Sequence, residues 1–185
     1  HANLRALEAV LRDGVRHSFD RLSVLGDVVG YGPEPEECVE RVAECASTCV
    51  RGNHDMAAVG AINLTQFNAD AAAACLWTRH RLSPSAVKYL SGLPLCADEP
   101  PFTLVHGSPR DPLWEYVVSP RTALALGVHC REMHCIVGHT HRPAVLCMVS
   151  AAEQREMELD GGVRASLSQR LLLNPGAVGQ PRDGD

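Results

Sequence analysis

Histidine, aspartate and asparagine residues cluster at four points of the chain, and each cluster follows a short apolar run. The clusters are Gly26-Asp27, Gly52-Asn53-His54-Asp55, His106-Gly107 and Gly138-His139-Thr140-His141. Imidazole, carboxylate and amide groups together favour manganese, iron, cobalt, nickel or zinc over calcium, which is bound by oxygen atoms alone. The residue types therefore predict a binding site for divalent transition metals.

Each of these clusters is weak by itself, although the Gly138–His141 cluster is stronger than the others because two histidines flanking a threonine after a strand rarely serve packing. Gly26-Asp27 is more often a plain turn, Gly52-Asn53 is typical of a hairpin, and a single histidine such as His106 more often makes a structural hydrogen bond. All four clusters in this order, each after an apolar run, outweigh these structural interpretations. Because five or six such ligands exceed the four that one zinc ion uses, two metal ions are the economical arrangement.

Hydrophobic periodicity predicts the elements that must position these residues. Helices are predicted at residues 3–13, 35–46, 69–82 and 121–126, with another beginning at Ser83-Pro84. Strands are predicted at residues 22–25, 48–50, 102–105, 135–137, 144–149 and 171–173. Gly14 is expected to end the first helix. Ligand sites in open α/β sheets lie beyond the carboxyl ends of strands, so the four clusters can converge there.

Length and composition indicate one globular domain. The chain has 185 residues, of which 45% are hydrophobic and 21% charged, and it contains no repeat or linker. A single domain of α/β layers with a mixed sheet is therefore expected over residues 1–185. The net charge of −5 makes long nucleic acid a poor partner. No apolar run approaches the ~20 residues of a membrane span, so no membrane association is expected.

The eight cysteines do not form a recognisable framework, because no Cys-x-x-Cys pair is present. Zinc ribbons and thioredoxin-like motifs are therefore unsupported, which also weighs against a purely structural zinc domain. Most of the cysteines stand among apolar residues and are expected to be buried thiols in a reducing compartment. Together with the lack of a visible signal peptide, this favours the cytoplasm.

At these positions the chain resembles the calcineurin-like metallophosphoesterases. The motif order of that family is Asp-x-His, Gly-Asp, Gly-Asn-His-Asp/Glu, a later His, and Gly-His-x-His. His1-Ala2-Asn3 looks like the end of the first motif, and the four clusters match the others. The run from Gly26 to Pro33 and the Asn174-Pro175-Gly176 segment resemble a small prokaryotic, phosphodiesterase-like branch. The resemblance covers essentially the whole chain and implies a four-layer α/β/β/α sandwich with two mixed sheets.

The resemblance also implies which side chains bind the metals. Six residues are expected to be ligands: His1, Asp27, Asn53, His106, His139 and His141. Asp27 would bridge both ions. His1 and His141 would complete the first site, while Asn53, His106 and His139 would complete the second. Two divalent transition metal ions are thus the expected cofactors, with manganese favoured over iron, zinc, cobalt and nickel.

In this scheme His54 binds no metal but acts on the leaving group, as a general acid or charge stabiliser. Asp55 is expected to form a hydrogen bond to His54 and to fix its tautomer. Bound cations lower the pKa of water from ~15.7 towards ~7, so a metal-bound hydroxide would attack phosphorus in line. The presence of His54 favours an enzyme over a non-catalytic metal-binding scaffold of the same fold, which stays open as an alternative.

One departure from the family pattern concerns the first motif. The Asp expected two residues before His1 is absent, and the chain is expected to lack the first strand and the C-terminal end of the family's domain. Two interpretations are open. The sequence is part of a longer chain, or it is a truncated protein whose first metal site lacks a carboxylate ligand.

The substrate is less well defined by the sequence. Arg51, Arg110 and Arg142 could hold phosphate oxygens or could pair with surface carboxylates. Trp114 and Tyr116 could stack a nucleobase or could pack their loop onto the domain. A small phosphoester is expected, either a phosphodiester or a nucleotide such as a dinucleoside polyphosphate. The alternative within the family is a phosphoprotein phosphatase.

Overall fold

The computed structural model describes residues 1–148, 155–156 and 165–182 of the chain. The chain divides into two compact units, His1–Pro94 with Val178–Gln180, and Leu95–Ala177 with Pro181–Asp185. A two-stranded sheet belongs to the first unit and a six-stranded sheet to the second, which confirms the predicted α/β fold with two sheets. The single domain expected over residues 1–185 stays a prediction.

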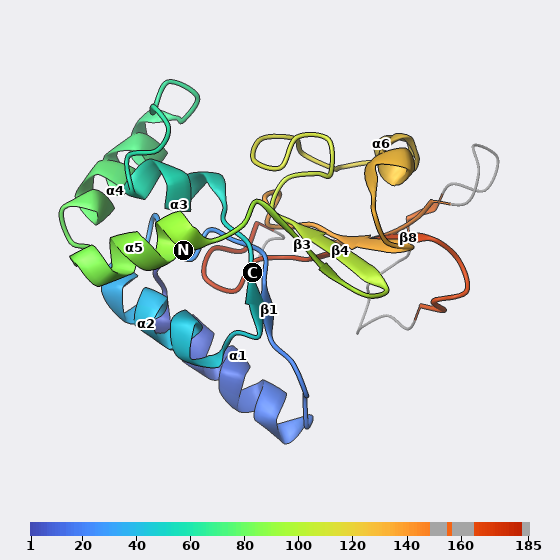
Figure 1. The fold of residues 1–185 in the computed structure, drawn as a ribbon, viewed down its shortest axis with the longest axis horizontal. Helices are drawn as coiled ribbons and strands as arrows, with labels where there is room; N and C mark the ends of the chain where they lie inside the picture. Colours follow the sequence, from blue (N-terminus) through green and yellow to red (C-terminus); the bar gives the residue numbers. More distant parts are fainter. Residues whose placement is uncertain (149–154, 157–164, 183–185) are drawn as a thin grey trace. The chain divides into compact units, whose positions relative to one another are not determined.

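The first unit consists of five helices and two short strands (Figure 1). Its helices are α1 (Leu4–Arg16), α2 (Pro35–Cys45), α3 (Asn53–Ala58), α4 (Ala69–Arg79) and α5 (Pro84–Gly92). Strands β1 (Ser23–Val24) and β2 (Thr48–Cys49) pair in parallel, so both lead towards the same edge of the small sheet. The core of this unit is formed by apolar residues of α2 and α5 and by Val28 and Val29, which follow β1.

Side-chain caps explain where three of these helices begin. The Asn3 and Asn68 side chains accept hydrogen bonds from Ala6 N and Ala71 N, at 3.1 and 2.9 Å. Ser83 caps α5 in the same way, and Pro84 occupies its first turn, as predicted. The predicted end of the first helix at Gly14 is wrong, because α1 continues to Arg16. A glycine inside a helix costs only about 1 kcal/mol relative to alanine, so it does not have to stop one.

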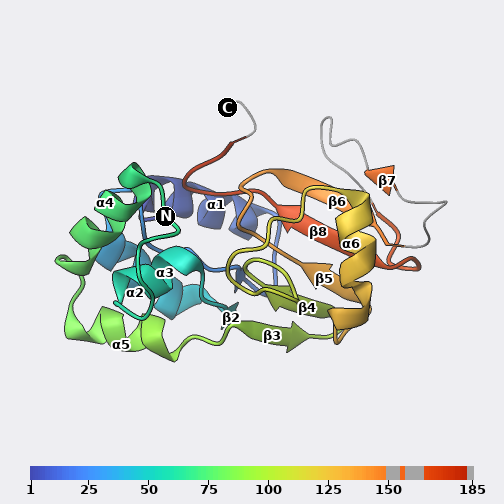
Figure 2. The same ribbon diagram turned by 90° about the horizontal axis from the view of Figure 1, so that it is seen from above.

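The second unit is built on a six-stranded mixed sheet with the strand order β3-β4-β5-β8-β6-β7. Its elements are β3 (Cys96–Glu99), β4 (Phe102–Val105), α6 (Pro120–Leu126), a 3-10 turn (Gly127–His129), β5 (His134–Ile136), β6 (Pro143–Cys147), β7 (Arg155–Glu156) and β8 (Leu171–Pro175). Strands β4, β5 and β8 are parallel, whereas β3, β6 and β7 pair antiparallel with their neighbours. Helix α6 lies on one face of this sheet (Figures 1 and 2).

This topology brings two of the predicted clusters to one edge of the larger sheet. His106 follows β4, and Gly138 to His141 follow β5, its parallel neighbour. Of the predicted strands, 144–149 corresponds to β6, although residue 149 lies outside the described residues. Strands β3 and β7 and helix α3 were not predicted from the sequence.

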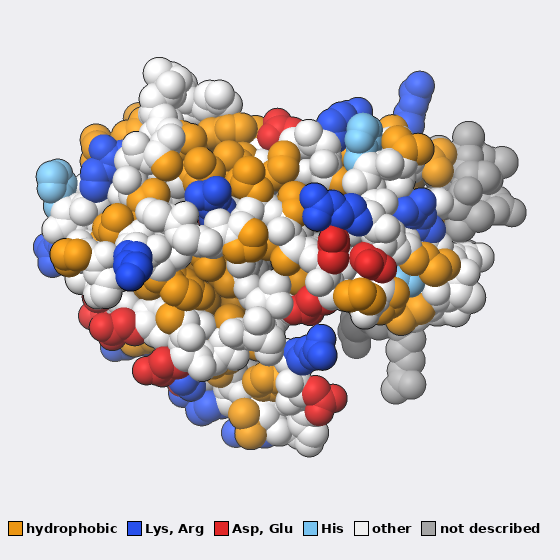
Figure 3. Space-filling model, viewed as in Figure 1, with side chains coloured by type: hydrophobic (Ala, Val, Ile, Leu, Met, Phe, Trp, Pro, Cys, Tyr) orange, Lys and Arg blue, Asp and Glu red, His pale blue; other side chains and the backbone are white. Residues whose placement is uncertain are grey.

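The described residues contain no helix that is long and apolar enough to cross a membrane. On the face drawn in Figure 3, Lys and Arg side chains are dispersed among acidic, polar and apolar ones.

Candidate metal centre

The first part of the site lies where β1 and β2 end. Gly26 has a φ of +84°, and a Cβ atom there would lie 2.5 Å from the backbone N of Gly52. A Cβ atom on Gly52 would lie 2.0 Å from Oδ1 of Asp27. The two glycines therefore permit a close approach of two backbone segments, and this approach places the buried Asp27 carboxylate against the beginning of α3.

The first turn of α3 carries three buried polar residues, Asn53, His54 and Asp55. The backbone N–H of His54 donates to Oδ1 of Asp27 at 2.9 Å. The Asp55 carboxylate accepts two backbone hydrogen bonds, from Val29 N at 3.1 Å and Gly52 N at 2.9 Å. The second of these is the return bond of a helix capping box.

The hydrogen bond from Asp55 to His54 stays a prediction, and the structure gives Asp55 two backbone contacts besides. Both of its oxygens accept from backbone amides, and a bond to the His54 imidazole is not among the contacts that the described part of the chain gives it. Burial raises the pKa of the Asp55 carboxyl to about 6, and the negative charge of Asp27 acts in the same direction. Asp55 thus joins the start of α3 to the loop after β1 and so fixes the position of His54 through the backbone.

The His54 imidazole is buried and is contacted from several sides. Its ring centroid lies 4.6 Å from that of Tyr31 and 5.1 Å from that of Phe67. Its Nδ1 is 3.4 Å from the sulfur of Cys75. Gly30, with φ +97°, brings its backbone so close that a Cβ atom there would lie 2.4 Å from the same nitrogen. These contacts restrict the ring to a narrow range of orientations.

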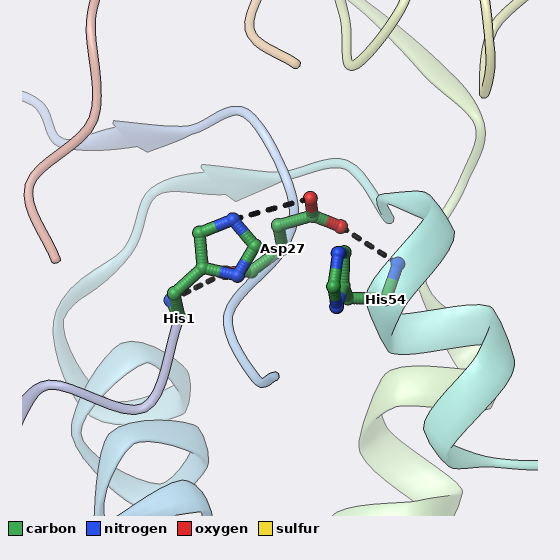
Figure 4. Close-up of side chains that lie close together, drawn as sticks. All are labelled: His1, Asp27 and His54. Atoms are coloured by element: carbon green, nitrogen blue, oxygen red, sulfur yellow. Dashed lines mark hydrogen bonds and ion pairs between the residues drawn. The ribbon is translucent and has the colours of Figure 1, made fainter. Parts of the chain in front are cut away.

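His1, Asp27 and His54 form a group that could hold a cation (Figure 4). Nε2 of His1 lies 3.4 Å from Oδ2 of Asp27, and one potential ligand atom from each residue lies within 4.8 Å of the others. Nδ1 of His1 is 3.1 Å from the carbonyl oxygen of Val29. With the proton on Nδ1 and donated to this carbonyl, Nε2 keeps the lone pair that binds a metal.

The second unit contributes another pair of donor atoms. Nε2 of His106 lies 3.1 Å from Nδ1 of His139, and both residues are buried. Two nitrogens that bind the same ion at ~2.05 Å are separated by roughly 2.9 Å when the N–metal–N angle is about 90°. The separation is roughly 3.3 Å when that angle is tetrahedral. The observed separation falls in this interval, so the two imidazoles fit the ligand sphere of one metal ion.

Several predicted metal ligands also have an unusual backbone conformation. Six non-glycine residues of the described ranges have left-handed φ values, and three of them are predicted ligands: Asp27 (52°), His139 (63°) and His141 (60°). This region costs an L-residue energy and is enriched in Asp, Asn and His. Such outliers cluster at functional sites, where the surrounding structure maintains them.

The remaining two predicted ligands are also buried. Asn53 is the first residue of α3, and the carbonyl oxygen of His141 accepts a hydrogen bond from Arg182 N at 3.3 Å. The structure thus groups His1, Asp27 and Asn53 in one unit, and His106, His139 and His141 in the other. The convergence of both groups on two shared ions stays a prediction from the sequence.

The three candidate phosphate-binding arginines differ in their contacts. The Arg110 guanidinium pairs with Glu115, and its Nε lies 3.3 Å from that carboxylate, in line with the alternative of a surface ion pair. Arg51 donates from Nη1 to the carbonyl of Ser91 at 3.4 Å. Arg142 is exposed and makes no ion pair with the described residues. Arg142 is therefore an exposed candidate that an ion pair with the described residues does not occupy.

Tyr116 and Trp114 have different surroundings on the loop after His106. The Tyr116 ring is 50% exposed and stacks on the imidazole of His139, with centroids 4.3 Å apart and planes 18° apart. Trp114 is more buried and lies edge-on to the same ring at 6.4 Å. Tyr116 is therefore a half-exposed aromatic residue directly beside a predicted ligand.

Sequence reasoning assigned no role to Asn174, which the structure places beside the Gly138–His141 segment. Its side-chain amide nitrogen donates to the carbonyl of Gly138 at 2.7 Å and to Oγ1 of Thr140 at 2.9 Å. The available signal was an asparagine at the end of a predicted strand, the same position that the four clusters occupy.

Comparisons with known proteins identify the family of the chain and its fold. The model of the calcineurin-like phosphoesterase superfamily domain matches residues 1–185. The protein MJ0912 of Methanocaldococcus jannaschii is 35% identical over 189 residues, which cover 100% of this chain and 75% of that protein. The crystal structure of a metallophosphoesterase from Sphaerobacter thermophilus is similar with a TM-score of 0.88 and 44% identity, covering 100% of this chain and 76% of that one. The crystal structure of the hypothetical protein PH1004 from Pyrococcus horikoshii OT3 is similar with a TM-score of 0.69 and 17% identity. The match covers 96% of this chain and 72% of that one, and it supports the fold alone.

The chain belongs to the calcineurin-like phosphoesterase superfamily, as the resemblance predicted. It is a metal-dependent phosphoesterase, a hydrolase of a family that binds divalent metal ions.

Proposed function

We propose that the chain hydrolyses small phosphoesters, preferentially a phosphodiester or a nucleotide such as a dinucleoside polyphosphate, with two divalent metal ions. One observation carries this proposal. Each unit contains a pair of buried donor atoms at the spacing of metal ligands, His1 with Asp27 at 3.4 Å and His106 with His139 at 3.1 Å. Imidazole and carboxylate donors suit manganese, iron, cobalt, nickel and zinc, and manganese is the ion to test first.

Each ion would be held by two donors from one unit and by a predicted third ligand from the other. His1 and Asp27 bind the first, with His141 as the predicted third ligand. His106 and His139 bind the second, with Asn53 as the predicted third ligand. An ion held in this way neutralises charge on the phosphoryl group and lowers the pKa of water in its ligand sphere towards ~7. The chain's own part is to hold these donors in place, which the buried positions and backbone contacts favour.

Asp27 is predicted to bridge both ions with its carboxylate. Asp27→Asn should remove both metals, because an amide is a much weaker ligand than a carboxylate. Elemental analysis after dialysis measures the stoichiometry directly, with Asp13→Asn on the exposed end of α1 as a matched control. Two metals retained by the Asp27 variant would eliminate the bridging role.

His54 is proposed to protonate or stabilise the departing oxygen. Its confined ring and its position in the first turn of α3 support a fixed orientation. His54→Ala should lower turnover by about 10²–10⁴-fold, the usual contribution of general acid–base catalysis, with metal content unchanged. Because His54 also lies in the group with His1 and Asp27, a loss of metal in this variant would identify it as a ligand instead.

The exposed ring of Tyr116 beside His139 supports a substrate that contains a nucleobase. Purified protein loaded with Mn²⁺ should be assayed against model mono- and diesters, nucleotides, dinucleoside polyphosphates and phosphopeptides. Activity on phosphopeptides alone would favour a phosphoprotein phosphatase. Lack of activity with both metals bound would favour a non-catalytic scaffold. We also propose the cytoplasm as its compartment, because all eight cysteines are free thiols.

A further inference from the structure

Asn174 uses its whole side-chain amide within the second unit. The amide nitrogen donates to the carbonyl of Gly138 at 2.7 Å and to Oγ1 of Thr140 at 2.9 Å, and the amide oxygen accepts from Gly176 N at 2.9 Å. The side chain is 4% exposed, so these bonds replace water. An amide is the group that this environment requires, because it supplies two donors and an acceptor from one planar end.

Thr140 is saturated in the same way. Its hydroxyl oxygen also accepts from Arg142 N at 3.2 Å, and its O–H faces the carbonyl of Arg142 at 3.4 Å. The backbone N–H of Thr140 bonds to the carbonyl of Gly138 at 2.7 Å. Asn174 therefore contacts the Gly138–His141 turn at two points, one on each side of His139.

The turn needs such contacts because its two histidines are strained. His139 and His141 have φ values of 63° and 60°. Residues held in sparsely populated backbone regions persist only where the surrounding structure maintains them. Buried hydrogen bonds to the turn stabilise it against relaxation. Loss of the two bonds from Asn174 would therefore favour relaxation of the turn.

We infer that Asn174 is a positioning residue: its amide holds the Gly138–His141 turn in the left-handed conformation that presents His139 and His141 for metal binding. This inference rests on the proposed function, in which both histidines are ligands. It goes further by assigning a role to a residue on a different strand, β8, that itself binds no metal. The competing explanation is that Asn174 only stabilises the sheet.

Asn174→Asp is the most specific perturbation. It preserves size but replaces both donors with a carboxylate oxygen, which would face the Gly138 carbonyl and the Thr140 hydroxyl oxygen. Leu171→Ala is the matched control, because Leu171 is a fully buried residue of the same strand and packs away from the turn, against Val145 and Cys147. It lowers stability without removing a hydrogen bond of the turn.

Two measurements on the full chain test the inference. In the metal-free protein, hydrogen exchange of the Thr140 and Arg142 amides should accelerate more in Asn174→Asp than in Leu171→Ala. Mn²⁺ titration followed by electron paramagnetic resonance should show binding weakened about 10–100-fold in Asn174→Asp, the usual effect of losing a group that orients a ligand. Leu171→Ala should bind Mn²⁺ with unchanged affinity.

A second pair of variants covers the case that Asn174→Asp does not fold. Thr140→Val removes the hydroxyl that the amide contacts and should weaken Mn²⁺ binding, whereas Thr140→Ser keeps the hydroxyl and should restore it. Equal exchange or equal Mn²⁺ affinity in Asn174→Asp and Leu171→Ala would overturn the inference. If the unmodified chain binds no Mn²⁺, the proposed function fails, and the exchange measurement still decides the role of Asn174.

Discussion

Replacing Gly52 with alanine tests whether the close contact between two backbone segments builds the first half of the metal centre. Gly52 has an extended backbone with φ −100°, which alanine adopts readily, so any effect comes from the added methyl group. That methyl group would lie 2.0 Å from Oδ1 of Asp27 and 2.6 Å from its backbone N. Both atoms belong to the residue on which the predicted metal site depends.

The size of the effect follows from these distances. Real Cβ atoms almost never approach a neighbour closer than 3.0 Å, so the Asp27 carboxylate has to move by about 1 Å. This movement breaks the 2.9 Å hydrogen bond from His54 N to Oδ1. Overpacking of this kind costs roughly 1–3 kcal/mol of folding stability. A displacement of ~1 Å in a functional group can reduce activity about 10²-fold.

The assay combines urea denaturation of the metal-free chain with Mn²⁺ titration by calorimetry. Gly92→Ala is the matched control, because Gly92 lies in α5 of the same unit and an added Cβ atom would meet nothing within 4 Å. It should be neutral or stabilising by up to about 1 kcal/mol, since alanine favours helix. If Gly52→Ala matches Gly92→Ala in stability and binds Mn²⁺ like the unmodified chain, the steric reasoning is refuted.

Three further outcomes are expected. Tyr116→Ala should raise KM for a nucleotide by about 5–150-fold, equivalent to ~1–3 kcal/mol of base stacking, while leaving a base-free phosphodiester unaffected. Tyr116→Phe should behave like the unmodified chain, and an unchanged KM in the alanine variant would contradict base stacking. Burial and the charge of Arg170 lower the pKa of His134, whose Nδ1 accepts from Leu171 N at 3.3 Å. As the pH falls, the unfolded chain therefore binds a proton at His134 before the folded chain does. The free energy of unfolding should decrease as the pH drops through ~6.5, by at most ~1.4 kcal/mol per pH unit for one proton. Urea titrations at several pH values should show a smaller decrease in His134→Gln, and the same pH dependence in both proteins would exclude this linkage. A chelator should lower Tm of the metal-loaded chain, because a ligand at 100 times its Kd contributes ~2.7 kcal/mol; superimposable melting curves would mean that the folded state binds no metal.

Much of the arrangement was predictable because it depends on short-range patterns. Apolar runs of three or four residues, each followed by a polar cluster, predicted the strands that precede Asp27, His106 and His139. The Ser83 cap made one helix start visible, since capping involves residues only three apart. The family motif order then grouped residues that are separated by more than 100 positions.

The missing parts depend on contacts between distant residues. Helix α3 begins after Gly52 without a Ser, Thr or Asp at its N-cap, so only Asp55 in its first turn signalled its start. The partners of Asp55 include Val29 N, 26 residues away, and no sequence pattern reveals that a carboxylate bonds to a backbone amide at that distance. The stacking of Tyr116 on His139 likewise exists only once the loop after β4 has folded.

The left-handed backbone of Asp27, His139 and His141 places a conformational cost on the residues proposed to bind metal. Glycine at any of these positions would relieve that cost in the backbone, while deleting a proposed ligand. A substitution that the backbone alone would favour is therefore one that the proposed metal centre would not tolerate.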